Sequence, residues 1–110
     1  MYTLEQLQAK TDEELVILVA EEVMGWEVDM GYFNTGDDNV ILPIVSWNPV
    51  SGSWDDTMQV VKKIVLEDCE RFRLSDYKVS CGWEVNIGEN GWCIDFNAQR
   101  AICIASLLAL

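Results

Sequence analysis

The most apolar stretch of the chain is its end, residues 98–110, which reads AQRAICIASLLAL. Residues 101–108 carry no charge and a single hydroxyl group, that of Ser106. A helix that is apolar on nearly all sides must be covered on nearly all sides. We therefore predict a C-terminal helix, capped by Asn97. The earlier elements either fold around it or form a sheet on which it lies.

Two amphipathic helices are predicted earlier in the chain. The first begins at Thr11, where the sequence TDEE is typical of a capping box, and Gly25 is placed to end it. Its apolar stripe consists of Leu15, Val19 and Val23. The second is predicted from the capping residue Ser53 to about Glu67. Its apolar stripe consists of Trp54, Met58, Val61 and Val65.

Alternating or β-branched segments predict strands at residues 31–34, 40–45, 69–74, 77–81, 83–87 and 92–96. Pro43 has no amide proton, so its strand is expected at a sheet edge. The last two strands form a hairpin whose apolar side chains we expect on one face: Trp83, Val85, Ile87, Trp92, Ile94 and Phe96. The pattern predicts an α+β fold, a mostly antiparallel sheet with helices packed on it, in a single domain over residues 1–110.

Charge is distributed unevenly along the chain, whose formal net charge is −12. Residues 1–56 contain twelve acidic residues and one basic residue, Lys10, whereas residues 57–110 contain seven acidic and six basic residues. Such a protein is repelled by nucleic acid and by anionic membranes but attracts a basic protein surface. The residues expected to form this partner-binding face are Glu13, Glu14, Glu21, Glu22, Asp37 and Asp38. The alternative is that the negative charge only keeps the protein soluble.

The sequence offers little for catalysis. It contains no histidine, which excludes nucleophiles activated by a histidine, and it lacks the glycine-rich phosphate-binding motifs. The four cysteines show no CxxC spacing, so we expect buried, reduced thiols, with two disulfides as the alternative. We therefore expect a protein that is not an enzyme and that binds no metal or cofactor.

The sequence contains two weaker candidate sites, a set of neighbouring carboxylates and an alternative ligand pocket. Neighbouring carboxylates, Asp37 with Asp38, Asp55 with Asp56, or Glu84 with Asp95, could hold a cation or act as a pair, but solvent exposure explains them more simply. An alternative ligand pocket for a small molecule such as a nucleotide would combine two aromatic side chains with the main basic cluster. Its residues are Trp47, Trp54, Lys62, Lys63, Arg71 and Arg73.

Three motifs, in order, resemble those of the phage ABA sandwich domain, a family of small phage and prophage proteins. They are Val23-Met-Gly-Trp26, Trp47-Asn-Pro49 with the helix that follows, and the terminal run RAICIASLLA at residues 100–109. The resemblance covers roughly residues 15–109. The helix start at Ser53 departs from the family's Ala-rich pattern, and residues 31–44 do not align. The resemblance implies an α-β-α sandwich and a phage origin, and it implies no established reaction.

Charge and resemblance together predict a small, acidic, phage-encoded binding protein. Its expected partner is a host protein with a basic surface, such as a nucleic-acid-binding or anti-phage defence protein, for example a CRISPR nuclease, which it would inhibit. The alternatives are a nucleotide-sequestering protein and a structural or assembly protein of the virion, with a homo-oligomer left open. No signal sequence or membrane-spanning run is evident, so we expect the cytoplasm of the host cell.

Overall fold

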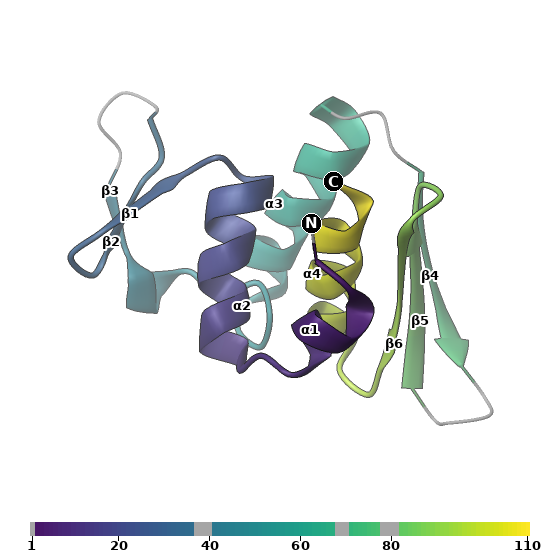
Figure 1. Cartoon of the computed structure of the whole chain (residues 1–110). Helices are drawn as coiled ribbons and strands as arrows, with labels where there is room; N and C mark the ends of the chain where they lie inside the picture. The colour runs from purple at the N-terminus through teal and green to yellow at the C-terminus, as the bar shows by residue number, and fades with distance from the viewer. Residues whose placement is uncertain (1, 37–40, 68–70, 78–81) are drawn as a thin grey trace.

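The computed structural model describes residues 2–36, 41–67, 71–77 and 82–110 of the chain. Its elements, labelled in Figure 1, are α1 (Leu4–Gln8), α2 (Asp12–Leu18), η1 (Val19–Val23), β1 (Glu27–Asp29), β2 (Tyr32–Asn34), β3 (Ile41–Pro43), η2 (Ile44–Ser46), α3 (Trp54–Lys62), η3 (Lys63–Glu67), β4 (Phe72–Tyr77), β5 (Gly82–Ile87), β6 (Gly91–Asp95) and α4 (Ala98–Ala109). The segments η1 and η3 are π-helical turns that continue α2 and α3, and η2 is a 3₁₀ turn.

Helix α4 lies at the centre of the molecule. It packs on β5 and β6 on one side and on α1, α2, η1 and α3 on the other. The strands form two antiparallel sheets, sheet A (β1-β2-β3) and sheet B (β4-β5-β6), which lie on opposite sides of the helices (Figure 1). The α+β fold with antiparallel strands is therefore confirmed. The order of layers differs from one sheet between two helical layers, the arrangement that the resemblance implies.

The predicted burial of the C-terminal helix is confirmed. Every residue from Ala98 to Leu107 is buried except Arg100. Asn97 caps the helix by accepting hydrogen bonds from the amides of Gln99 and Arg100. The hydroxyl of Ser106 donates to the carbonyl oxygen of Ile102 at 2.7 Å, which satisfies it inside the helix. The apolar sequence thus forms a rod that the remaining elements cover.

The start and end of α2–η1 also agree with the sequence. Thr11 and Glu14 form the reciprocal capping box, and Gly25 follows the helix with a φ of 72°. The apolar stripe faces the core: Leu15, Val19 and Val23 are all buried. A second capping box, at Thr3, begins α1. These local signals are strong because each satisfies backbone amides that the first turn of a helix leaves unpaired.

The predicted core face of α3 is correct for Val61, which is buried, and for Val65, which packs against the core, but wrong for Trp54 and Met58. Trp54 and Met58 are exposed, and the buried residues of α3–η3 are Thr57, Val60, Val61 and Ile64. Thr57 is tolerated in the core because its hydroxyl donates to the carbonyl oxygen of Pro49 at 2.7 Å and accepts from Gln99 Nε2 at 3.1 Å. The core positions that hydropathy assigns to Trp54 and Met58 are thus occupied by a hydrogen-bonded threonine, Thr57, and two aliphatic residues, Val60 and Ile64.

The predicted facing of the β5–β6 hairpin is also wrong. Its connection consists of three residues, 88–90, so Ile87 pairs with Gly91 and Val85 with Cys93. The core face of β6 therefore carries Gly91 and Cys93, while Trp92 points outward. Small residues are needed there because α4 passes close to β6. A Cβ atom at Gly91 would lie 2.5 Å from the carbonyl oxygen of Ala105.

The remaining strand predictions are confirmed only in part. Pro43 lies on β3, an edge strand of sheet A, as predicted. Strand β1 was not predicted. The strand expected at 69–74 overlaps β4 at residues 72–74. Of the strand expected at 77–81 only Tyr77, the last residue of β4, is described, because residues 68–70 and 78–81 lie outside the described residues.

Candidate functional site

The sequence-predicted acidic face lies on α2 and η1. Glu13 and Glu14 belong to the first turn of α2, Glu21 and Glu22 belong to η1, and all four are exposed. Asp37 and Asp38, the other two predicted members, lie outside the described residues. The chain contains no Lys or Arg between Lys10 and Lys62. The acidic helix, α2–η1, therefore lies within a long stretch of sequence that supplies no positive charge.

Glu14 has a structural task in addition to its charge. Its Oε1 accepts a hydrogen bond from the amide of Thr11 at 3.1 Å, and its own amide donates to Thr11 Oγ1 at 3.2 Å. These hydrogen bonds to Thr11 lower the pKa of Glu14 below its ordinary value of 4.5. A carboxylate whose pKa is lowered by folding stabilises the folded state above its unfolded pKa, and this contribution is lost as the pH falls through the lowered value.

A groove with a volume of about 630 Å³ runs beside the acidic face. Its polar lining on α2 comes from Asp12 and Glu13. Its apolar lining comes from α2, η2 and the residue after η2: Val16, Ile17, Ile44, Val45 and Trp47. The carboxylate of Asp12 is paired with the guanidinium of Arg100. The side chain of Asp12 is still 44% exposed, and Glu13 is exposed as well, so both carboxylates reach the solvent at this groove.

The predicted ligand pocket does not assemble as one site. Trp47 is only 2% exposed. Its ring centroid lies 4.6 Å from that of Trp26 and 5.7 Å from that of Phe33, and its Nε1 donates to Gln59 Oε1 at 2.7 Å. Trp54 is half-exposed at the start of α3. The buried Trp47 cannot stack on a ligand base without opening the core.

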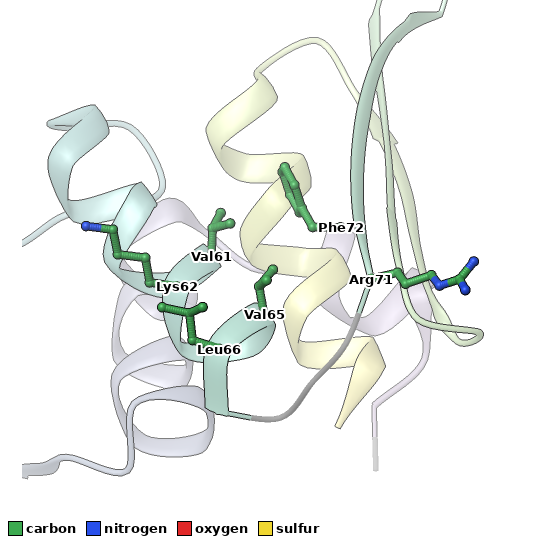
Figure 2. A pocket seen from close by; sticks show the side chains of 6 residues that line it. All are labelled: Val61, Lys62, Val65, Leu66, Arg71 and Phe72. Carbon is green, nitrogen blue, oxygen red and sulfur yellow. The ribbon is translucent and has the colours of Figure 1, made fainter.

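Two members of the basic cluster, Lys62 and Arg71, line the same groove, but their charged ends do not converge. A groove of about 640 Å³ between α3–η3 and β4 is lined by Val61, Lys62, Val65, Leu66, Arg71 and Phe72. In Figure 2 the side chains of Lys62 and Arg71 extend away from the apolar residues, in opposite directions. Arg71 and Arg73 also line a shallow site on sheet B together with Glu84, and Lys63 begins η3. This groove is apolar at its centre, and its two cations point outward.

The thiols that the structure describes are buried and free. Burial, with a smaller effect of Asp95, raises the pKa of Cys93 to about 12, and burial also raises the pKa of Cys103. Both thiols therefore stay protonated and act as small apolar residues of the core. Cys69 and Cys81 lie outside the described residues.

The carboxylates of Glu84 and Asp95, one of the possible pairs, are held apart. Glu84 accepts from the indole Nε1 of Trp92 at 3.0 Å, whereas Asp95 lies 3.5 Å from Nε of Arg100, on the other face of sheet B. Within the described part of the chain, no group of three His, Cys, Asp or Glu side chains is arranged to hold a metal ion. The same residues include no helix long and apolar enough to cross a membrane.

One surface feature was not predicted from the sequence, the exposed apolar side chains on and beside sheet A. They are Met30, Tyr32, Ile41 and Val45. The alternation in Glu27-Val-Asp29 and Tyr32-Phe-Asn34 is the signal that could have found them. It places Val28 and Phe33 on one face and leaves the flanking residues on the other.

The comparisons with known proteins place the chain in a family. No curated protein matches its sequence. A 2.0 Å crystal structure of a phage protein from Bacillus cereus ATCC 14579 matches it over 100% of both chains, with a TM-score of 0.71 and 18% sequence identity, which establishes a shared fold. The sequence profile of the Phage ABA sandwich domain matches residues 17–107. The chain therefore belongs to the Phage ABA sandwich domain family.

Proposed function

We propose that this phage protein is a non-catalytic binding protein that acts in the cytoplasm of the host cell. Its acidic face docks on a basic surface of a host protein and inhibits that protein. A host nucleic-acid-binding or defence protein suits this role, because its basic surface is otherwise used to receive phosphates. The observation that supports the proposal is the presence of four exposed carboxylates on α2–η1, within a stretch of sequence without Lys or Arg.

The physical basis is the field that these carboxylates produce. Glu13, Glu21 and Glu22 are exposed on one continuous helix, and Glu27 and Asp29 of β1 follow directly. Like charges gathered on one surface raise the association rate with an oppositely charged surface. This attraction weakens as salt screens it, over a distance of about 8 Å at physiological ionic strength.

The two alternatives have less support. A nucleotide-sequestering protein would need aromatic stacking beside the cations, and Trp47 is buried away from the groove that Lys62 and Arg71 line. A virion structural protein would form a large assembly, which size-exclusion chromatography of the purified chain detects directly.

Charge reversal on the acidic face tests the proposal. The triple variant Glu13→Lys/Glu21→Lys/Glu22→Lys leaves the capping residue Glu14 in place, so we expect the far-UV circular dichroism to stay unchanged. A matched control, Glu5→Lys/Asp55→Lys/Glu89→Lys, makes the same change in net charge at exposed positions on α1, α3 and the β5–β6 connection. Both variants and the wild type are used to capture proteins from host lysate at low and at high salt.

We expect the wild type and the control variant to retain a basic host protein at low salt that the face variant loses. High salt should release this protein from both. Equal capture by all three chains would contradict the proposal, because another surface would then be responsible. An equal loss of capture in both variants would also contradict it, because net charge alone would then explain the binding. Capture that does not depend on salt would contradict it as well.

A further inference from the structure

The outer face of sheet A is exposed on all three of its strands. In the register of the sheet, Glu27 pairs with Asn34, Asp29 with Tyr32, Tyr32 with Pro43 and Asn34 with Ile41. Residues directly opposite each other share a face, and these six are all exposed. The other face carries Val28, Phe33 and Leu42, and Phe33 is fully buried against Trp26 and Trp47. One face of sheet A thus packs on the core, and no described element covers the other.

Apolar side chains collect on and beside this outer face. Tyr32 is 51% exposed and Ile41 is 57% exposed. Met30, in the turn between β1 and β2, is 92% exposed, and Val45, in η2, is 95% exposed. The amide of Ile44 donates to the carbonyl oxygen of Gly31 at 2.9 Å, which joins η2 to the turn that carries Met30. We call Met30, Tyr32, Ile41 and Val45 the sheet A patch.

Met30 adopts a backbone conformation that does not suit its side chain. Its φ is 44° and that of Gly31 is 86°, so both central residues of this two-residue turn lie in the left-handed region. Asn, Asp and Gly are the residues that such hairpin turns favour. A methionine here strains the backbone, and its exposed side chain gains little packing within the chain. Packing within the chain therefore does not account for methionine at this position.

The charge around the patch indicates what it binds. Glu27 and Asp29 lie on the same face as Tyr32, and η1, which carries Glu21 and Glu22, packs against β1. An apolar surface bordered by carboxylates fits a segment whose apolar side chains enter the patch while its Lys or Arg side chains reach the border.

We propose that the sheet A patch is the docking site for a basic segment of the partner protein that also carries apolar side chains. This inference rests on the proposed function and names the part of the surface that supplies specificity. The carboxylates of α2–η1 attract the partner, and the sheet A patch holds it. An apolar centre with a charged border is the usual arrangement of a protein interface.

Three synthetic peptides of equal length test the proposal, composed of alternating Lys and Val, alternating Lys and Ser, or alternating Glu and Val. Binding is measured by fluorescence anisotropy and mapped by amide chemical shifts of the isotope-labelled chain. We expect the Lys/Val peptide to bind about tenfold more tightly than the Lys/Ser peptide. The changes in amide chemical shift that this peptide causes in the labelled chain should concentrate in residues 27–34 and 41–46. The Glu/Val peptide should not bind.

A double variant of the patch, Tyr32→Ser/Val45→Ser, should lose about tenfold in affinity for the Lys/Val peptide. The matched control Phe96→Ser/Leu66→Ser also removes one exposed aromatic and one exposed aliphatic side chain, from the residue that follows β6 and from η3. It should bind like the wild type. If the patch variant bound like the control, the inference would be overturned.

Met30→Asn separates binding from folding. Asparagine suits the first position of this turn, so we expect a higher midpoint of thermal unfolding together with an affinity for the Lys/Val peptide that is a few-fold lower. If the midpoint rises as expected, a loss of binding by this variant cannot be explained by unfolding. Unchanged affinity in a more stable protein would remove Met30 from the site, and a lower midpoint would refute the strain at this turn.

The remaining outcomes are distinguishable. Equal binding of the Lys/Val and Lys/Ser peptides, unaffected by the patch variant, would overturn this inference but leave the proposed function intact. Equal binding of the Glu/Val peptide would overturn both, because charge would then play no part. Absence of binding by all three peptides would overturn the inference. Self-association of the wild type that the patch variant abolishes, seen by sedimentation, would also overturn it by assigning the patch to a second copy of the chain.

Discussion

We expect the substitution Ile104→Ala to lower the free energy of unfolding by about 4 kcal/mol. Ile104 is 0% exposed and lies in the middle of α4, the helix that both sheet B and the other helices contact. Removing a buried isoleucine side chain loses its transfer free energy and leaves a cavity that close-packed neighbours fill only in part. Chemical denaturation monitored by tryptophan fluorescence measures this change.

The control is the same substitution at an exposed isoleucine. Ile41→Ala removes identical atoms from an edge strand where the side chain is more than half exposed. We expect a loss of about 0.5 kcal/mol there. If the two variants were equally stable, α4 would not be the covered centre of the fold.

The substitution Gly91→Ala should lower the free energy of unfolding by about 3 kcal/mol. The added Cβ would lie 2.5 Å from the carbonyl oxygen of Ala105 and 2.6 Å from that of Ile87. Both atoms belong to the backbone, so α4 and β5 must move apart from β6 before the methyl group fits. Thermal unfolding followed by circular dichroism measures the loss.

Gly82→Ala provides a graded comparison for this contact. A Cβ at Gly82 would lie 3.0 Å from the carbonyl oxygen of Asp95, a longer distance than those at Gly91. We therefore expect the Gly82 variant to unfold at a temperature between those of the Gly91 variant and the wild type. The reverse order would show that α4 does not approach β6 as closely as the structure indicates.

Local signals in the sequence predicted helix boundaries well. The capping box at Thr11, the caps at Ser53 and Asn97, and the helix end at Gly25 all appear where the sequence places them. Each of these signals is decided by hydrogen bonds or dihedral angles within a few residues. The burial of α4 by the other elements was also predictable, because its sequence has no polar side that could face the solvent.

Two facing predictions failed because tertiary contacts decided them. On α3, the hydrogen bonds of Thr57 to Pro49 and Gln99 allow a polar residue to face the core. In the β5–β6 hairpin, the three-residue connection and the close approach of α4 turn Trp92 outward and Cys93 inward. Gln99 lies 42 residues from Thr57 in the sequence, and Ala105, whose carbonyl oxygen approaches Gly91, lies on the far half of α4.

The candidate site was predictable only in part. The acidic helix followed from the charges in residues 11–29, because exposed carboxylates on an amphipathic helix need no tertiary information. The sheet A patch was not predicted from the sequence, because apolar residues in short strands are normally assigned to the core. Only the register of β1, β2 and β3 shows that Tyr32 and Ile41 share a face with Glu27 and Asp29.

The footprint of a captured host protein on this chain tests the central claim most directly. Hydrogen–deuterium exchange is compared for the free chain and for its complex. We predict protection in residues 12–23, where the acidic helix lies, and in residues 27–34 and 41–46 of sheet A and η2. Protection confined to β4, β5 and β6, or to the groove lined by Val61 and Phe72, would contradict the claim that the acidic side of the molecule recognises the partner.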